Sequence, residues 1–197
     1  MPDRPDAPQT AAEARAEVEA RRSEDRAARE AVFTERYGGE APGRAILVAS
    51  WISTAVLALA TVAAVVAPDA FDGAFLVVAL VYFLGGSALF AVDVVLAALR
   101  SRDSAMGMGG LFFLAGSAPR SVQQHLITSM VLQIVVALVG AGIGFARLQG
   151  KEVNALAFGV LAPVVGLALC GLWGVRHGLF PDRQVPADPD RGRARGR

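Results

Sequence analysis

The chain has 197 residues, of which 54% are hydrophobic and only 19% are charged, and its formal net charge is +1. A soluble domain carries roughly 25% charged residues, whereas most charges here lie in residues 1–44 and 176–197, and the mean hydropathy is +0.45. These values exclude a single soluble core. One cysteine, Cys170, excludes an intrachain disulfide and a cysteine-based zinc site. Since no nucleotide-binding glycine motif, catalytic triad order or HExxH is present, we expect no enzyme, cofactor or metal.

The first 44 residues form a charged head. Residues 1–10 are polar and proline-rich, which predicts disorder. Residues 11–36 contain strong helix formers and no Gly or Pro, and pairs such as Glu17 and Arg21 stand four residues apart. That spacing stabilises a helix by about 0.2–0.5 kcal/mol per pair. The head therefore predicts a charged helix without a wide apolar stripe, and its mixed charges are unlike those of a signal peptide.

Four apolar segments are long enough to cross a bilayer, whose hydrocarbon core of roughly 30 Å needs about 20 residues. The predicted spans are residues 45–67, 74–97, 122–146 and 153–175. Short turns separate the first span from the second and the third from the fourth, and links this short require antiparallel neighbours. The sequence therefore predicts an all-α membrane protein whose four transmembrane helices form two antiparallel hairpins.

The positions of the basic residues predict the orientation. Of the 19 Lys and Arg residues, all but Arg147 and Lys151 lie in the head, in the loop between the second and third spans, or in the tail. Cytoplasmic segments of membrane proteins carry the excess of Lys and Arg. We therefore expect both termini and the central loop to face the cytoplasm, with the protein in a bacterial plasma membrane.

Asp93 is the one acidic residue inside an apolar run. A carboxylate at the bilayer centre costs about 2.5–3.5 kcal/mol and is often functional, so one hypothesis is a proton or cation site, or a partner for an arginine of another helix. The simpler interpretation is that the second span ends near Val92 and leaves Asp93 among the headgroups. Arg100, on the same helix face, is then its expected partner through those headgroups.

Polar residues also mark the third span. His125, which can titrate near neutral pH, either pairs with Asp93 at the cytoplasmic face or begins the helix at headgroup level. Gln133 lies deeper and is expected to bond a span-one Ser or Thr, with a role in transport as the alternative. Arg120 lies in the first turn of this helix, after Pro119. A functional site, if present, is expected where the central loop meets Asp93, Arg120 and His125.

Small residues repeat along the last two spans. Gly140 and Gly144 form a GxxxG pattern in the third span. The fourth span has a small residue at every fourth position: Ala162, Gly166, Cys170 and Gly174. Because small side chains let helices approach closely in lipid, we expect these two spans to pack tightly together, with a homo-oligomer seam as the alternative. Pro163 is expected to kink the fourth span.

The central loop and the tail are the remaining segments. Residues 105–118 are mostly apolar but too short to span a bilayer. They are predicted to lie in the interface, with a re-entrant loop or a lid over the inner end of the bundle as alternatives. Residues 176–197 are predicted to be a disordered basic tail. A plain solvated tail is the simplest interpretation of its arginines. Attraction to anionic lipid is a simpler alternative than nucleic acid, and no nucleic-acid partner is expected.

The stretches LFFLAGSAPRSVQQ and GLWGVRHGLFP, with the glycine-rich spans between them, resemble uncharacterised small four-helix membrane proteins of high-GC Gram-positive, actinobacterial-type bacteria. The resemblance covers about residues 45–180 and implies no activity. Spans without the charges of a pump favour an accessory or scaffold subunit of the cell envelope, and the charged helix at residues 11–36 is suited to docking a partner. That partner is expected to be a membrane protein, with a homo-oligomer as the alternative. A small oligomeric transporter or channel that uses Asp93 and Gln133 is the alternative.

Overall fold

The computed structural model describes residues 10–38, 40, 42–147 and 154–183, and in these residues the regular structure is helical apart from one isolated bridge between Ser104 and Asp182. Four helical segments are long and apolar enough to cross a membrane. They are α2 (Arg44–Val66), α3 (Pro68–Arg100), α5 (Arg120–Arg147), and a fourth segment made of the 3₁₀ helix η1 (Ala155–Leu161) and α6 (Val164–His177). The all-α class and the four helices of membrane-spanning length agree with the sequence analysis.

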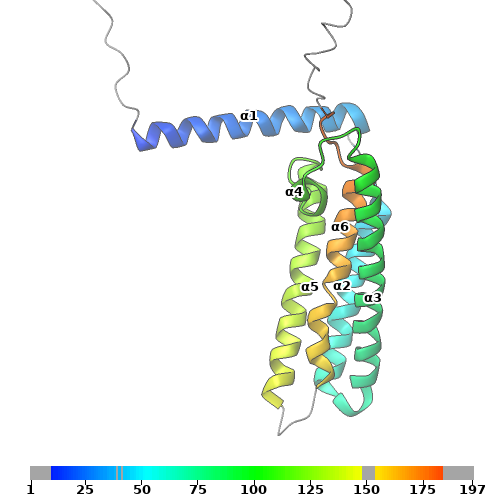
Figure 1. The fold of residues 1–197 in the computed structure, drawn as a ribbon. Helices are drawn as coiled ribbons and strands as arrows, with labels where there is room; N and C mark the ends of the chain where they lie inside the picture. Colours follow the sequence, from blue (N-terminus) through cyan, green and yellow to red (C-terminus); the bar gives the residue numbers. More distant parts are fainter. Residues whose placement is uncertain (1–9, 39, 41, 148–153, 184–197) are drawn as a thin grey trace, which may run out of the picture.

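These four segments run side by side as a bundle, and the last one lies against the other three (Figure 1). In α6, eight of the ten residues from Gly166 to Val175 are buried. The outer sides of α2, α3 and α5 expose large apolar side chains along their length. This is the pattern of a bundle with a protein core and an apolar outer surface, as a bilayer requires.

The second span begins earlier than predicted. Residues 68–73 were expected to form a turn, but α3 starts at Pro68, and only Ala67 separates it from α2. Proline fits the first position of a helix because its missing N–H needs no partner there, and Asp69 in the first turn is favourable near the positive end of the helix dipole. The helix then continues through Asp93 to Arg100.

The fourth span is divided at the predicted proline. A 3₁₀ helix leads up to Ala162, and the α-helix starts directly after Pro163. Proline removes a backbone donor, and a 3₁₀ segment is a common way to accommodate such an interruption. The side chain of Asn154 caps the start of η1 by accepting a hydrogen bond from the N–H of Leu156 at 2.8 Å. Of the predicted turn at residues 147–152, Arg147 belongs to α5, and residues 148–152 lie outside the described residues.

The apolar loop folds over one end of the bundle. Its short helix α4 (Met108–Phe112) buries Leu111 and Phe112 beside Val175 of α6, and Leu114 after it is fully buried. Of the three alternatives for residues 105–118, packing over the bundle is the one that the contacts support. The loop is pinned at both ends, because the N–H of Leu179 donates to the carbonyl of Ser117 at 2.9 Å and that of Ala105 to Pro181 at 2.8 Å.

Disorder from residue 176 onward was therefore a wrong prediction for the described part of the tail. Helix α6 extends to His177, and residues 178–183 follow the central loop, where the N–H of Arg183 also donates to Asp103 at 3.0 Å. These bonds join segments far apart in sequence and leave no local pattern. Residues 184–197 lie outside the described part of the chain.

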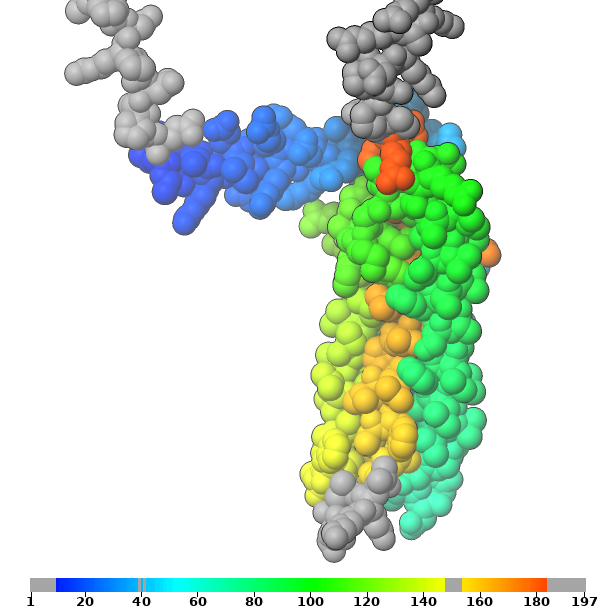
Figure 2. Space-filling model, viewed as in Figure 1, coloured from blue at the N-terminus to red at the C-terminus, as the bar shows by residue number. Residues whose placement is uncertain are grey.

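The head forms α1 (Ala11–Tyr37), which crosses the same end of the bundle and extends well beyond it (Figures 1 and 2). It starts with a capping box between Thr10 and Glu13 and ends at Gly38 in the left-handed conformation. Its one buried residue is Phe33, and the Tyr37 hydroxyl donates to the carbonyl of His177 at 2.6 Å. One end of α1 is thus attached to the bundle while most of its length is exposed.

Candidate functional site

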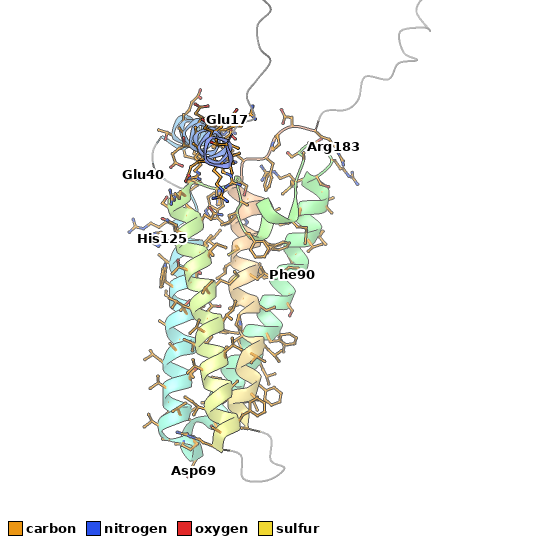
Figure 3. All side chains as sticks on the ribbon, turned by 90° about the vertical axis from the view of Figure 1, so that its left-hand side faces the viewer. Glu17, Glu40, Asp69, Phe90, His125 and Arg183 are labelled. Atoms are coloured by element: carbon orange, nitrogen blue, oxygen red, sulfur yellow. The ribbon has the colours of Figure 1, made fainter. Side chains whose placement is uncertain are left out.

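The three residues predicted to meet at the central loop are separate. His125 is exposed, and its ring makes an edge-on contact with Trp51 at 6.3 Å between centroids. Figure 3 shows His125 and Phe90 on opposite sides of the bundle. Asp93 is fully buried, close to the Phe112 ring that stacks on Phe90 at 4.8 Å. The expected pairing of Asp93 with His125 is therefore absent.

Asp93 occupies a closed position between α3, α4 and α6. A Cβ atom at Gly171 would lie 2.8 Å from its Oδ2 and 2.7 Å from Cε1 of Phe112, so only glycine leaves room for the carboxyl group. Neither carboxyl oxygen has a hydrogen-bond partner among the described residues. With no base, nucleophile or second acid bonded to it, this carboxyl group can hold a proton but has no evident partner in catalysis.

Arg100, the expected partner of Asp93, is engaged elsewhere. Its guanidinium donates to the carbonyls of Val175 at 2.6 Å and Gly178 at 2.8 Å, and it lies 5.5 Å from the ring centre of Phe180. These carbonyls belong to the end of α6, whose last groups have no partner within the helix. Arg100 therefore caps α6, and the predicted pairing with Asp93 does not form.

Gln133 is the centre of a buried polar cluster between α2 and α5. Its Nε2 donates to the hydroxyls of Ser53 and Thr54, both at 3.0 Å, and these are span-one hydroxyls of the kind that the sequence indicated. The hydroxyl of Ser129, one turn away, bonds with those of Ser50 and Thr54. Each such contact contributes about 0.6 kcal/mol on average in membranes. Because the bonds join specific positions of the two helices, the cluster fixes the register of α2 against α5.

Glycines bring the helices into backbone-level contact. In α5, Gly140 faces Thr61 and Leu156, while Gly144 faces Leu156 and Asn154 at the start of η1. The GxxxG pattern therefore packs on both α2 and η1, and the tight contact expected with the fourth span is present.

The small-residue stripe of the fourth span meets two different partners. Gly166 faces Met130 and Gln133 of α5, whereas Gly174 lies against the backbone of Leu111 in α4. Cys170, between them, is fully buried in the core. The stripe therefore closes the bundle against α5 and against the loop, and not against α5 alone.

A close approach between α3 and α6 was missed by the sequence analysis. Gly86 of α3 would place a Cβ 2.6 Å from Cγ1 of Val164 and 2.7 Å from the backbone nitrogen of Val165. The only sequence signal was a Gly-Gly-Ser run, which equally indicates a flexible point.

A cavity of about 840 Å³ lies outside the bundle interior, between α1 and the start of α5. Its basic side chains are Arg26, Arg29 and Arg120, and its one acid is Glu30. Phe33 forms part of its wall. Arg120, one of the predicted site residues, lines this cavity, and its arginine neighbours come from a helix that the sequence analysis did not connect with it.

Comparison with known proteins gives no match to a family model, to a curated protein or to a solved structure. Among the described residues, no three His, Cys, Asp or Glu side chains are grouped as metal ligands would be.

Proposed function

We propose that the chain is a multi-pass protein of a bacterial plasma membrane, built as two antiparallel hairpins, that serves as an accessory or scaffold subunit of the cell envelope and not as an enzyme. Helix α1, the central loop and the described part of the tail lie at one end of the bundle, and the first turn of α3, with Asp69, lies at the other (Figures 1 and 3). The basic residues gather at the first end, which supports a cytoplasmic position for both termini.

The observation that carries the scaffold proposal is the closed interior of the bundle. One core cluster, with Leu126, Met130, Cys170 and Trp173, fills the half near α1, and a second, with Leu57, Phe75 and Leu156, fills the other half. Gly86 brings α3 against the backbone of α6 between them. A transport path needs polar groups along a continuous water-filled route. The two apolar clusters fill the interior on either side of the hydroxyls that Gln133 binds, so this polar cluster is enclosed between them.

Helix α1 supplies the surface for a partner. It has 27 residues, about 40 Å at 1.5 Å per residue, and every residue from 11 to 32 is exposed. A helix that is polar on all sides is typically one that bridges through solvent to another protein. Because Phe33 and Tyr37 fix only its C-terminal end, the rest is presented beside the bundle (Figure 2).

The proposal is tested by purifying the tagged full chain in mild detergent and identifying the proteins bound to it. We expect to recover an envelope protein, and we expect that recovery to be lost when Glu24, on the exposed part of α1, is changed to Lys. The matched control is Asp69→Lys at the other end of the bundle, which leaves recovery unchanged. Recovery of monomer alone, or a partner retained equally by both variants, would contradict the scaffold role.

The alternative function is a small transporter, which Asp93 favours because it is buried and its carboxyl oxygens accept no hydrogen bond from the described residues. A transporter predicts that the wild-type protein carries a proton or cation flux across proteoliposomes, and that Asp93→Asn abolishes this flux. A closed bundle predicts no flux above that of empty liposomes for either protein, and a flux that depends on Asp93 would replace the scaffold proposal.

A further inference from the structure

The cavity under α1 carries an excess of positive charge. Arg26 and Arg29 reach it from α1 and Arg120 from the first turn of α5, against the single carboxylate of Glu30. Arg29 is held in place, because its Nε donates to the carbonyl of Asp25 at 3.0 Å and its guanidinium packs on Gly116 of the loop. The first turn of α5 also adds the partial positive charge of a helix N-terminus.

The same side of α1 is basic along most of its length. Arg15, Arg22, Arg26 and Arg29 follow one another at spacings of seven, four and three residues, and Phe33 comes four residues later. Residues at these spacings lie on one face of a helix. Since Phe33 is the residue buried against the bundle, this face is turned toward the plane in which the bundle ends.

Acidic residues concentrate on the opposite face of α1. Glu13, Glu24 and Glu35 are eleven residues apart, which is close to three full turns, and each stands on the side away from Phe33. Two acids, Glu19 and Glu30, do lie near the basic face. The four arginines outnumber them, so the face toward the bundle end is net positive and the outer face is net negative.

The cavity lies where a charged surface meets an apolar one. Below Arg120, the outer side of α5 exposes large apolar side chains, among them Val131, Ile134, Val135 and Leu138. In Figure 3, α1 is seen end-on, above this helix and above His125. A ligand with an anionic head and an apolar body would contact both surfaces at once, whereas a soluble phosphopeptide would use only the first.

We propose that this cavity binds the phosphate of an anionic phospholipid, with Arg26, Arg29 and Arg120 as its ligands and the acyl chains along α5. Arginine suits this role because its planar group can bind two phosphate oxygens together. The rest of the basic face then follows neighbouring headgroups and holds α1 parallel to the membrane surface. The inference needs the bilayer placement proposed above but not the scaffold role.

The test measures lipid binding to the purified full chain by native mass spectrometry in detergent. Phosphatidylglycerol is compared with phosphatidylcholine of the same acyl chains. Each arginine near an anionic surface is worth about fivefold in affinity, so Arg29→Gln/Arg120→Gln is expected to weaken binding of the first phosphatidylglycerol about 25-fold. Binding of phosphatidylcholine stays the same. The matched control, Arg21→Gln, removes an arginine from the other side of α1 and keeps the wild-type preference.

Three results would overturn the inference. The first is an unchanged preference in the double variant whose helical circular dichroism matches that of wild type. The second is a loss of about fivefold in Arg21→Gln, which is what removal of any one positive charge would give if only the net charge mattered. The third is displacement of the lipid by inorganic phosphate or by a phosphopeptide at equal concentration, which would assign the cavity to a soluble ligand.

Discussion

Two adjacent glycines of α3 give a sharp test of how closely the spans pack. An alanine at position 86 would place its Cβ 2.6 to 2.9 Å from Val164 Cγ1 and from the backbone of Val165, whereas an alanine at position 85 would meet nothing within 4 Å. Carbon atoms do not approach this closely without strain, and backbone atoms cannot turn away as a side chain can. Gly86→Ala must therefore push α3 and α6 apart.

The magnitude follows from the difference between Gly86→Ala and Gly85→Ala. Both substitutions gain the same helix propensity, about 0.8–1 kcal/mol, so this contribution cancels in the comparison. What remains is the cost of overpacking, about 1–3 kcal/mol. We expect Gly86→Ala to be less stable than Gly85→Ala by that amount, with Gly85→Ala as stable as wild type or slightly more so.

The assay is reversible unfolding of the three proteins in mixed micelles, followed by far-ultraviolet circular dichroism as the denaturing detergent is raised. Helix content before unfolding serves as the control for correct folding. Equal stability of Gly86→Ala and Gly85→Ala would refute the close approach of α3 and α6, and with it the closed interior on which the scaffold proposal depends.

Three further predictions concern single positions. Gly43→Ala is expected to be about 1–3 kcal/mol less stable than Gly38→Ala. Both glycines have a positive φ, but only a Cβ at Gly43 would meet another side chain, Trp173, at 2.8 Å. Equal unfolding midpoints of the two variants would contradict this contact. Asp93→Asn is expected to raise stability by about 1 kcal/mol or more, since an ionised carboxylate without a hydrogen-bond partner costs more to bury than a neutral amide, and a loss of stability would reveal an interaction that needs the carboxylate. The backbone N–H of the N-cap threonine lowers the pKa of Glu13, so the first turn of α1 gains stability above the ordinary glutamate pKa and loses it as the pH falls through the lowered value. Cα chemical shifts of that turn should show this loss in wild type and not in Glu13→Gln.

The spans were predictable because each depends on a local property of the chain. An uninterrupted apolar run of about 20 residues has few alternatives to a membrane-length helix, and α2 and α5 begin and end close to the expected residues. The start of α3 was missed because proline and aspartate favour both a turn and the first turn of a helix. The attachment of residues 178–183 was missed because it depends on hydrogen bonds to the distant central loop.

The candidate site residues also fall into two groups: some could be predicted from the local sequence, and others depend on contacts with distant parts of the chain. The bonding of Gln133 to α2 could be inferred because a deep polar residue in a span needs a partner, and hydroxyls in span one were available. The surroundings of Asp93 could not be inferred, since they depend on the space left by Gly171 in a helix far along the chain. The joining of Arg120 with Arg26 and Arg29 depends on where Phe33 attaches α1, a tertiary contact with no local sequence signal.

The closed interior of the bundle can be tested most directly with the one native cysteine. Cys170 is fully buried among Leu126, Met130 and Trp173, and a charged maleimide reagent reaches only thiols in contact with water. The full chain in nanodiscs, which leave both membrane faces accessible, is treated with the reagent, with Glu40→Cys as an exposed control. A closed scaffold predicts labelling of the control cysteine only, and labelling of Cys170 only after denaturation. Rapid labelling of Cys170 in the native protein would demonstrate a water-filled path and contradict the proposed function.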